Sequence, residues 1–221
     1  MSHYLEYEAI KNDIAKVRDT IIEIIEPGSI EDSLCKGFSI WFSELTYNPN
    51  FLLIGINPGA GYFNNTGIKY REIDLEPSDV FEYGEYGGIL AEETIDVFKE
   101  ANRFEDLEKS VKFNIHYLVT SNQKDLFLLQ GILLDKYNIN MYAKAKEWTM
   151  QLIDLITPKY IVCEGAYPSK RVAEYYDKKI EWEQDLCEYE IKENIRVLGY
   201  KRLYSKITNK TGLSNNISKL D

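Results

Sequence analysis

The stretch FLLIGINPGAGYF, residues 51–63, places a carboxamide side chain directly after an apolar run. Asn57 follows FLLIGI and precedes a Pro-Gly pair, so a stiff turn would hold its side chain in place. A carboxamide has no useful basicity, but it can orient a water molecule for attack on a substrate. Asn, Pro and Gly are also common turn residues, and a purely structural turn is the alternative.

The glycines of this stretch do not match the common nucleotide-binding loops. GINPGAG lacks the Gly-Lys-Ser/Thr ending of a P-loop, and it lacks the GxGxxG spacing of a dinucleotide fingerprint. The chemistry expected of this turn therefore centres on Asn57 and not on a phosphate-binding backbone.

A second candidate segment is VKFNIHYLV, residues 111–119, which has the composition of a buried strand. Asn114 offers both a hydrogen-bond acceptor and hydrogen-bond donors in one carboxamide. His116 lies two residues further on the same expected strand face, where it lines a pocket or is a buried structural histidine, the favoured interpretation. Glu164, at the end of a later strand, is another pocket-edge candidate; its alternative is a carboxylate bonded to backbone amides.

The third segment is SKITNKTGLSNN, residues 205–216, which follows the last expected strand. Asn209 and the Gly212-Leu213 pair could contact a substrate, and the alternative for Leu213 is a core residue at a helix start. Four side chains of this segment could contact phosphate groups, although solvated lysines are an equally good interpretation: Ser205, Lys206, Lys210 and Ser214.

These segments resemble motifs of the uracil-DNA glycosylase superfamily. Gly55-Ile56-Asn57-Pro58-Gly59 resembles its first motif, and is closest to the mismatch-specific and single-strand-selective branches. TNKTGLSNN, residues 208–216, resembles the Asn-Pro-Ser-Gly-Leu-Ser loop of the mismatch-specific branch, with Lys210 where that family has proline. VKFNIHYLV resembles the middle strand, whose Asn recognises the pyrimidine. The likeness spans most of residues 50–217, but identity is confined to these short motifs.

The resemblance implies a DNA glycosylase that flips a uracil or related damaged base out of DNA and hydrolyses its N-glycosidic bond, as in base excision repair. It implies no metal and no cofactor, and uracil-containing or mismatched DNA as the partner. Asn57, which would hold the water, and Asn209 are the expected catalytic residues. The expected substrate-binding residues are Gly55, Ile56, Pro58, Gly59, Tyr62, Phe63, Asn114, His116, Gly212 and Leu213. Tyr62 or Phe63 would stack on the base, and Leu213 would enter the base stack.

Departures from the family pattern keep a second function open. Lys210 replaces proline, and the His-Pro-Ser motif and the Asp at the water position of another branch are missing. Without a general base at Asn57, catalysis would be slow. A non-catalytic nucleic-acid or nucleotide-binding protein of the same fold is therefore the alternative, and a hydrolase of free nucleosides or another small ligand is a third possibility.

The elements that must position these residues are four short apolar runs at 51–56, 111–119, 159–165 and 195–204. Near-continuous apolar character suits strands covered on both faces, and helices are expected between them at 140–156 and 168–179. This order predicts an α/β three-layer sandwich with a central four-stranded parallel sheet. We expect a single domain, with a helical part at 1–48 and a core at 51–217, and a ligand at the carboxyl ends of the strands.

Charge and composition limit the functional classes. The 221 residues carry a net charge of −10, but the acids crowd into 72–108, whereas 196–219 contains six cations and no acid. An asymmetric DNA-binding surface or two solvated faces of opposite sign would both give this pattern. Three widely spaced cysteines and two histidines predict neither a disulfide framework nor a metal site. No apolar run is long enough to span a membrane, and a cytoplasmic protein is expected.

Overall fold

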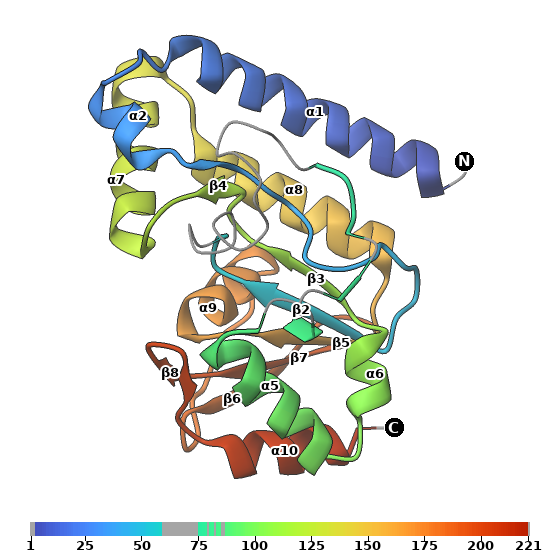
Figure 1. Ribbon diagram of the computed structural model, residues 1–221. Coiled ribbons are helices and arrows are strands. Elements are labelled where there is room, and N and C mark those ends of the chain that lie inside the picture. The colour runs from blue at the N-terminus through green and yellow to red at the C-terminus, as the bar shows by residue number, and fades with distance from the viewer. Residues whose placement is uncertain (1–2, 59–74, 79, 82, 85–86, 221) are drawn as a thin grey trace. The chain divides into compact units, whose positions relative to one another are not determined.

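The structure is a computed structural model, which describes residues 3–58, 75–78, 80–81, 83–84 and 87–220 (Figure 1). The chain divides into two compact units, each built from segments that are distant in the sequence. We call Met1–Trp41, Asn57–Pro77 and Asn114–Leu155 the helical unit, and Phe42–Ile56, Ser78–Phe113 and Ile156–Asp221 the sheet unit. These units do not follow the expected division at residues 48–51, and the single-domain organisation stays a prediction.

The sheet unit is organised by a five-stranded sheet in the order β3-β2-β5-β7-β6. Its strands are β2 (Phe51–Gly55), β3 (Val111–Asn114), β5 (Tyr160–Cys163), β6 (Leu186–Lys192) and β7 (Ile195–Tyr200). β5 lies parallel to both β2 and β7. The α/β class, and a mostly parallel sheet flanked by helices, are confirmed.

The predicted count of four parallel strands was wrong, because β6 adds an antiparallel strand beside β7. Its residues alternate in exposure, which is the pattern of an edge strand with one solvated face. β6 therefore lacks the continuous apolar run by which the other strands were predicted. The hairpin turn before β7 contains Asn194 with a φ of 66°, a backbone conformation that asparagine tolerates well.

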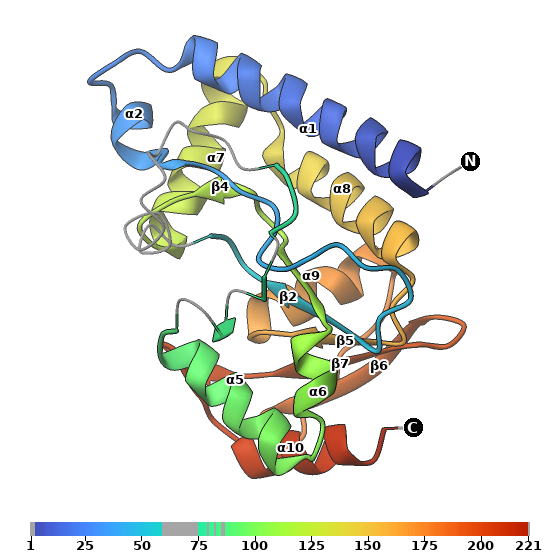
Figure 2. The same cartoon turned by 45° about the vertical axis from the view of Figure 1, so that its right-hand side comes forward.

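Helices cover both faces of this sheet. α9 (Ala166–Tyr175) lies on one face, and α5 (Ile89–Glu100) and α10 (Lys210–Ser218) lie on the other (Figures 1 and 2). Phe51 and Leu53 of the sheet join Val97 of α5 and Ile217 of α10 in one buried cluster, which also includes α6 (Phe104–Glu108). The three-layer arrangement therefore has its core between the sheet and the α5–α10 pair.

The expected strand 111–119 is divided in two. β3 ends at Asn114, and β4 (Leu118–Val119) pairs antiparallel with β1 (Gly37–Phe38) in a separate ribbon. His116 therefore lies in the connection after β3 and not on the strand face that carries Asn114, which corrects the prediction. A second small ribbon, β8 (Arg202–Leu203) with β9 (Lys206–Ile207), follows β7.

The helical unit contains α1 (His3–Ile24), α2 (Ile30–Leu34), α7 (Gln123–Tyr137) and α8 (Met141–Ile156). α8 matches the expected helix at 140–156, whereas α9 begins and ends earlier than the expected 168–179. α1 is tied to α8 because Trp148 Nε1 and Lys144 Nζ both contact Asp13 Oδ2, at 2.8 and 3.0 Å. Among the described helices, none combines the length and apolar character that crossing a membrane requires.

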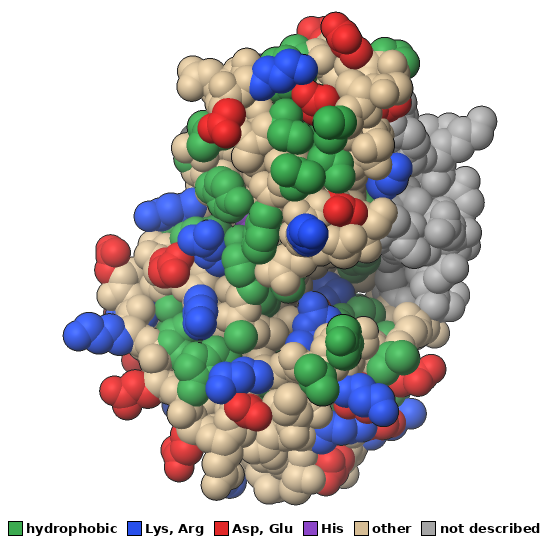
Figure 3. Space-filling model, turned by 90° about the vertical axis from the view of Figure 1, so that its left-hand side faces the viewer, with side chains coloured by type: hydrophobic (Ala, Val, Ile, Leu, Met, Phe, Trp, Pro, Cys, Tyr) green, Lys and Arg blue, Asp and Glu red, His purple; other side chains and the backbone are tan. Residues whose placement is uncertain are grey.

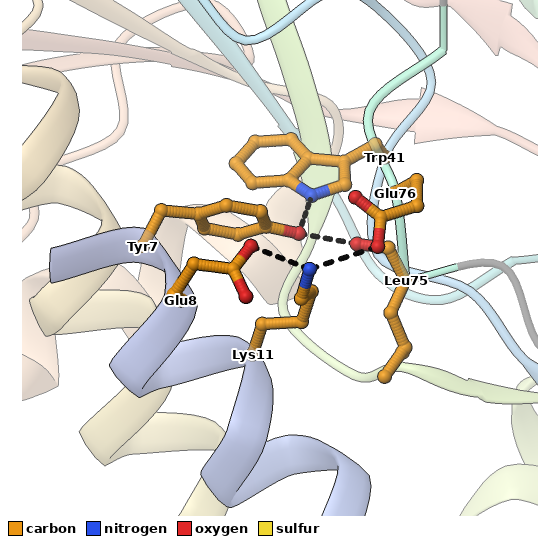
Figure 4. A network of polar contacts seen from close by, with 6 residues as sticks. All are labelled: Tyr7, Glu8, Lys11, Trp41, Leu75 and Glu76. Atoms are coloured by element: carbon orange, nitrogen blue, oxygen red, sulfur yellow. Dashed lines mark hydrogen bonds and ion pairs between the residues drawn. The ribbon is translucent and has the colours of Figure 1, made fainter. Parts of the chain in front are cut away.

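A polar network fastens α1 to the chain at Leu75 and Glu76 (Figure 4). The Tyr7 hydroxyl donates to the Leu75 carbonyl and accepts a hydrogen bond from Trp41 Nε1 at 2.6 Å. Lys11 Nζ contacts Glu76 Oε1 at 2.9 Å, and burial opposes but does not outweigh this bond, so the pKa of Lys11 is raised. The N-terminal helix thus holds a specific point of the chain that follows the Asn57 segment.

Candidate functional site

Asn57 lies two residues beyond the end of β2, and its side chain is half-buried. Its Nδ2 donates to the Pro58 carbonyl at 3.0 Å and to Thr120 Oγ1 at 3.1 Å, and the Leu118 carbonyl lies 3.5 Å away. These contacts join the segment after β2 to the segment after β3. The amide of Asn57 is therefore held by partners from outside its own turn.

The partners also determine the orientation of the Asn57 carboxamide, that is, which side Nδ2 and Oδ1 face. The two carbonyl oxygens can only accept, and the Thr120 hydroxyl donates its own proton to the Asn122 carbonyl at 2.9 Å. The NH₂ end of Asn57 must therefore face this cluster, which leaves Oδ1 on the opposite side. No described residue donates a hydrogen bond to that Oδ1. Asn57 is thus an oriented amide with an available acceptor.

Helix α7 provides the rigid base of this cluster. Asn122 is the N-cap of α7, and its Oδ1 accepts a hydrogen bond from the Asp125 backbone N–H at 2.9 Å. The chain from Asn57 through Thr120 to Asn122 therefore ends on a capped helix. A local capping preference in the sequence thereby sets the position of a side chain more than sixty residues away, since Asn57 and Thr120 are 63 residues apart.

Asn114 is the last residue of β3 and is only 6% exposed. Its carboxamide makes no hydrogen bond with any described residue. A buried amide without partners costs about 1–3 kcal/mol of desolvation, so most buried amides in folded proteins are paired. Asn114 therefore has unused hydrogen-bonding capacity at the carboxyl end of a strand, where ligands of open α/β sheets bind.

His116 has the surroundings of a structural histidine. It is buried, its Nδ1 lies 2.9 Å from Nε2 of the buried Gln130 on α7, and its ring meets Tyr142 edge-on. These contacts support the favoured interpretation, in which His116 is a satisfied core residue. The His116 ring is almost fully buried, so the structure gives no support for its expected contact with a substrate.

The remaining residues of the first motif are only partly described. Gly55 ends β2 and is buried, Pro58 is buried, and Ile56 is half-buried. Gly59, Tyr62 and Phe63 lie outside the described residues, so the expected stacking aromatic stays a prediction.

Asn209 belongs to the sheet unit and acts as the N-cap of α10. Its Oδ1 accepts a hydrogen bond from the Gly212 backbone N–H at 2.9 Å, and its Nδ2 donates to the Gln184 carbonyl at 2.8 Å. A Cβ at Gly212 would lie 2.6 Å from Asn209 Nδ2, so this glycine permits the cap. Both ends of the Asn209 amide are therefore engaged in holding the fold, unlike those of Asn57.

Leu213 and Ser214 are both 2% exposed. Leu213 belongs to the buried cluster between α5, α10 and the sheet, which is the alternative position considered for it. A residue buried in this way cannot enter a base stack, and buried Ser214 cannot contact a phosphate, while the helix stays folded. Both expectations are corrected by the amphipathic packing of α10, which turns these two side chains inward.

The two lysines of this segment differ from each other. Lys210 Nζ lies 3.3 Å from Glu93 and 3.1 Å from Asp96 on α5; burial lowers its pKa, but these two bonds outweigh burial and raise it overall. Lys206 is exposed, and Ser205 is half-buried in the β8–β9 turn. The acidic α5 therefore neutralises Lys210, and Lys206 is the better candidate for a phosphate contact.

The sheet unit contains a buried ion pair, of which only the acidic member, Glu164, was a candidate from the sequence. Lys112 in β3 and Glu164 after β5, 4% and 1% exposed, form a salt bridge, and Glu164 also accepts a hydrogen bond from the Tyr83 hydroxyl at 2.5 Å. Burial, and then the Glu164 charge, raise the pKa of Tyr83 well above its usual value, so its hydroxyl remains a donor. Among the described residues, Glu164 is thus bonded to the side chains of Lys112 and Tyr83, and no backbone amide donates to its carboxylate. A lysine within the apolar run VKFN was the signal for this pair.

The cysteines Cys35, Cys163 and Cys187 are all free and buried, and burial raises the pKa of Cys187 to about 11. Within the described part of the chain, no group of three or more His, Cys, Asp or Glu side chains could hold a metal ion. Comparison with models of protein families and with curated proteins gives no match.

Proposed function

We propose that this protein is a DNA glycosylase that hydrolyses the N-glycosidic bond of uracil or a related damaged base. The observation that carries the proposal is the pair of carboxamides in the helical unit with hydrogen-bonding groups that no described residue engages: the oriented Oδ1 of Asn57 and the buried amide of Asn114. The resemblance of residues 55–59 and 111–119 to uracil-DNA glycosylase motifs supports the same assignment.

Asn57 would serve as the group that positions water. With its NH₂ end held by Thr120, its Oδ1 can accept a hydrogen bond from a water molecule and aim the water oxygen at C1′ of the sugar. The water oxygen would bond to C1′ as the C1′–N bond breaks, and the electron pair of that bond leaves with the base. The water proton is released to solvent or to the departing base, because a carboxamide cannot retain it.

Asn114 would select the base. A carboxamide can donate to a pyrimidine carbonyl and accept from the adjacent N–H, and hydrogen bonding to the departing anionic base also favours bond cleavage. Selection by hydrogen bonds discriminates strongly, because a wrong base leaves the buried amide unpaired. The three free, buried cysteines support a reducing compartment, the cytoplasm, as the place of this reaction.

The test is release of free base from uracil-containing single-stranded, U:A and G:U oligonucleotides. Wild type should release uracil from at least one of them, and Asn57→Ala should lose most of this activity. Asn215→Ala removes an exposed carboxamide from α10 and serves as the matched control. Absence of release by correctly folded wild type from all three substrates would contradict the proposal.

A second function, DNA or nucleotide binding without catalysis, is favoured by one observation. Asn209, the second expected catalytic residue, has both ends of its amide engaged in capping α10. A non-catalytic protein would bind DNA with an affinity that falls as salt concentration rises, and would release no base. Measuring binding and release on the same oligonucleotides distinguishes the two functions.

A further inference from the structure

The β8–β9 hairpin presents two large apolar side chains to solvent. Arg202 pairs with Ile207 and Leu203 pairs with Lys206, so Tyr204 and Ser205 form a two-residue loop. Leu203 is 67% exposed and Tyr204 is 90% exposed, whereas Ile207 at the base of the hairpin is buried. The hairpin is therefore anchored at its base and apolar at its tip.

The backbone at the tip makes the choice of tyrosine unusual. Tyr204 has a φ of 56°, in the left-handed region where glycine or asparagine is the favoured hairpin residue. Tyrosine stabilises neither this turn nor the core, because its ring is almost fully exposed. Strained positions that the surrounding structure maintains are common where a side chain contacts a ligand. The Tyr204 ring is thus better explained by a partner than by folding.

The charges around the hairpin indicate the chemistry of that partner. Of the cations between residues 196 and 219, three contact carboxylates: Arg196 with Glu188, Lys201 with Asp185, and Lys210 with Glu93 and Asp96. Arg202 and Lys206, the two cations of the hairpin itself, contact no carboxylate among the described residues. Arg202 lies opposite the buried Ile207 and against Gly165, whereas Lys206 is exposed. Figure 3 faces the side on which β8 lies in Figure 1 and shows Lys and Arg side chains among apolar and acidic ones.

We infer that the β8–β9 hairpin is a DNA-contact element, in which the Tyr204 ring stacks on a nucleobase while Lys206 binds a flanking phosphate. An exposed aromatic beside an exposed lysine that contacts no described carboxylate fits a polyanion whose bases present flat faces, and fits it best where bases are unstacked. Leu203 beside Tyr204 adds an apolar contact to the base edge. This inference rests on the proposed function only for the choice of DNA as partner.

The experiment measures binding of a fluorescent oligonucleotide by anisotropy, with 2-aminopurine as a reporter of base stacking. Tyr204→Ala should weaken binding to single-stranded or gapped DNA about tenfold and abolish the 2-aminopurine change, and Tyr204→Phe should retain both. Lys206→Gln should lower the slope of log affinity against log salt by about one. Tyr4→Ala, which removes an exposed tyrosine from α1, is the matched control. Circular dichroism verifies that each variant is folded.

Unchanged DNA binding by Tyr204→Ala, or no DNA binding by wild type, would overturn the inference. Loss of binding to phosphatidylserine–phosphatidylcholine vesicles by Tyr204→Ala, with DNA binding intact, would also overturn it and assign the hairpin to a membrane surface. Base release is scored separately. Tyr204-dependent DNA binding without base release would retain the inference and reject the proposed function, whereas base release with Tyr204-independent binding would do the reverse.

Discussion

The asparagines Asn57 and Asn114 of the helical unit differ from Asn209 of the sheet unit in how their amides are used. In the sheet unit, the Asn209 amide uses both ends to cap α10 and bind Gln184, and Lys112 and Glu164 neutralise each other in the interior. In the helical unit, Asn57 is oriented through its NH₂ end, and the buried Asn114 has no hydrogen-bond partner among the described residues.

This difference separates a structural asparagine from one that can bind a ligand. Asn57 and Asn209 both follow strands and both contact backbone groups, so residue type and local context do not distinguish them. The distinction lies in whether the acceptor oxygen is already engaged: Asn209 Oδ1 receives the Gly212 N–H, whereas no described residue donates to Asn57 Oδ1. Mutations that remove one polar group at a time test this comparison.

The largest expected effect is at the paired interior of the sheet unit. Lys112→Met leaves the Glu164 carboxylate buried without its cation, so it should lower the free energy of unfolding by about 3–5 kcal/mol. Urea denaturation measures this change, and Lys206→Met, at an exposed lysine that contacts no described carboxylate, is the control. The double variant Lys112→Met/Glu164→Leu should recover much of the loss. A change below about 1 kcal/mol in the single variant would contradict this account.

The next effect is on activity. Asn57→Ala should reduce the rate of base release about 100-fold, because the attacking water loses its positioning group. The free energy of unfolding should fall by only about 1 kcal/mol, because the variant also removes the NH₂ group that donates to Thr120 Oγ1 and to the Pro58 carbonyl. Thr120→Val, which removes a holder of the amide, should reduce the rate by a smaller factor. If Asn57→Ala lowers the free energy of unfolding by as much as it raises the activation free energy of base release, Asn57 is instead a structural turn residue.

A smaller effect is expected at Asn209. Asn209→Ala should lower the free energy of unfolding by about 1 kcal/mol, because α10 loses its N-cap. Asn209→Asp keeps the capping oxygen and should recover most of this stability. Thermal or urea unfolding measures both variants. Loss of base release by Asn209→Asp at unchanged stability would restore the expected catalytic role of this residue.

The smallest effect on stability is expected at Asn114. Asn114→Ala removes a buried amide that has no described partner, so the desolvation penalty of about 1–3 kcal/mol that is relieved should offset the packing lost with the side chain. The free energy of unfolding should therefore stay within about 0.5 kcal/mol of wild type. Binding of free uracil, measured by calorimetry or by inhibition of base release, should nevertheless be lost. A destabilisation above about 2 kcal/mol would mean that the fold itself uses this amide.

Several structural features follow from local sequence patterns. The apolar runs give β2, β5 and β7, and the periodic stretch before Pro158 gives α8. β6 was not predicted, because an edge strand alternates and lacks a continuous apolar run. The β3–β4 break at Ile115 was not predicted either, because the partner of β4 is the distant β1 and the apolar run continues through the break.

The sequence by itself determined the α/β class, placed Asn57 just after a strand and placed Asn114 on a strand, because apolar runs and turn residues act over a few positions. Only the tertiary structure decided which side chains remain available. Asn57 is held by a residue 63 positions away, Asn209 by one 25 positions away, and Lys210 is neutralised from 117 positions away. Hydrogen bonds and ion pairs form between groups that are close in space, and the fold alone brings such distant positions together.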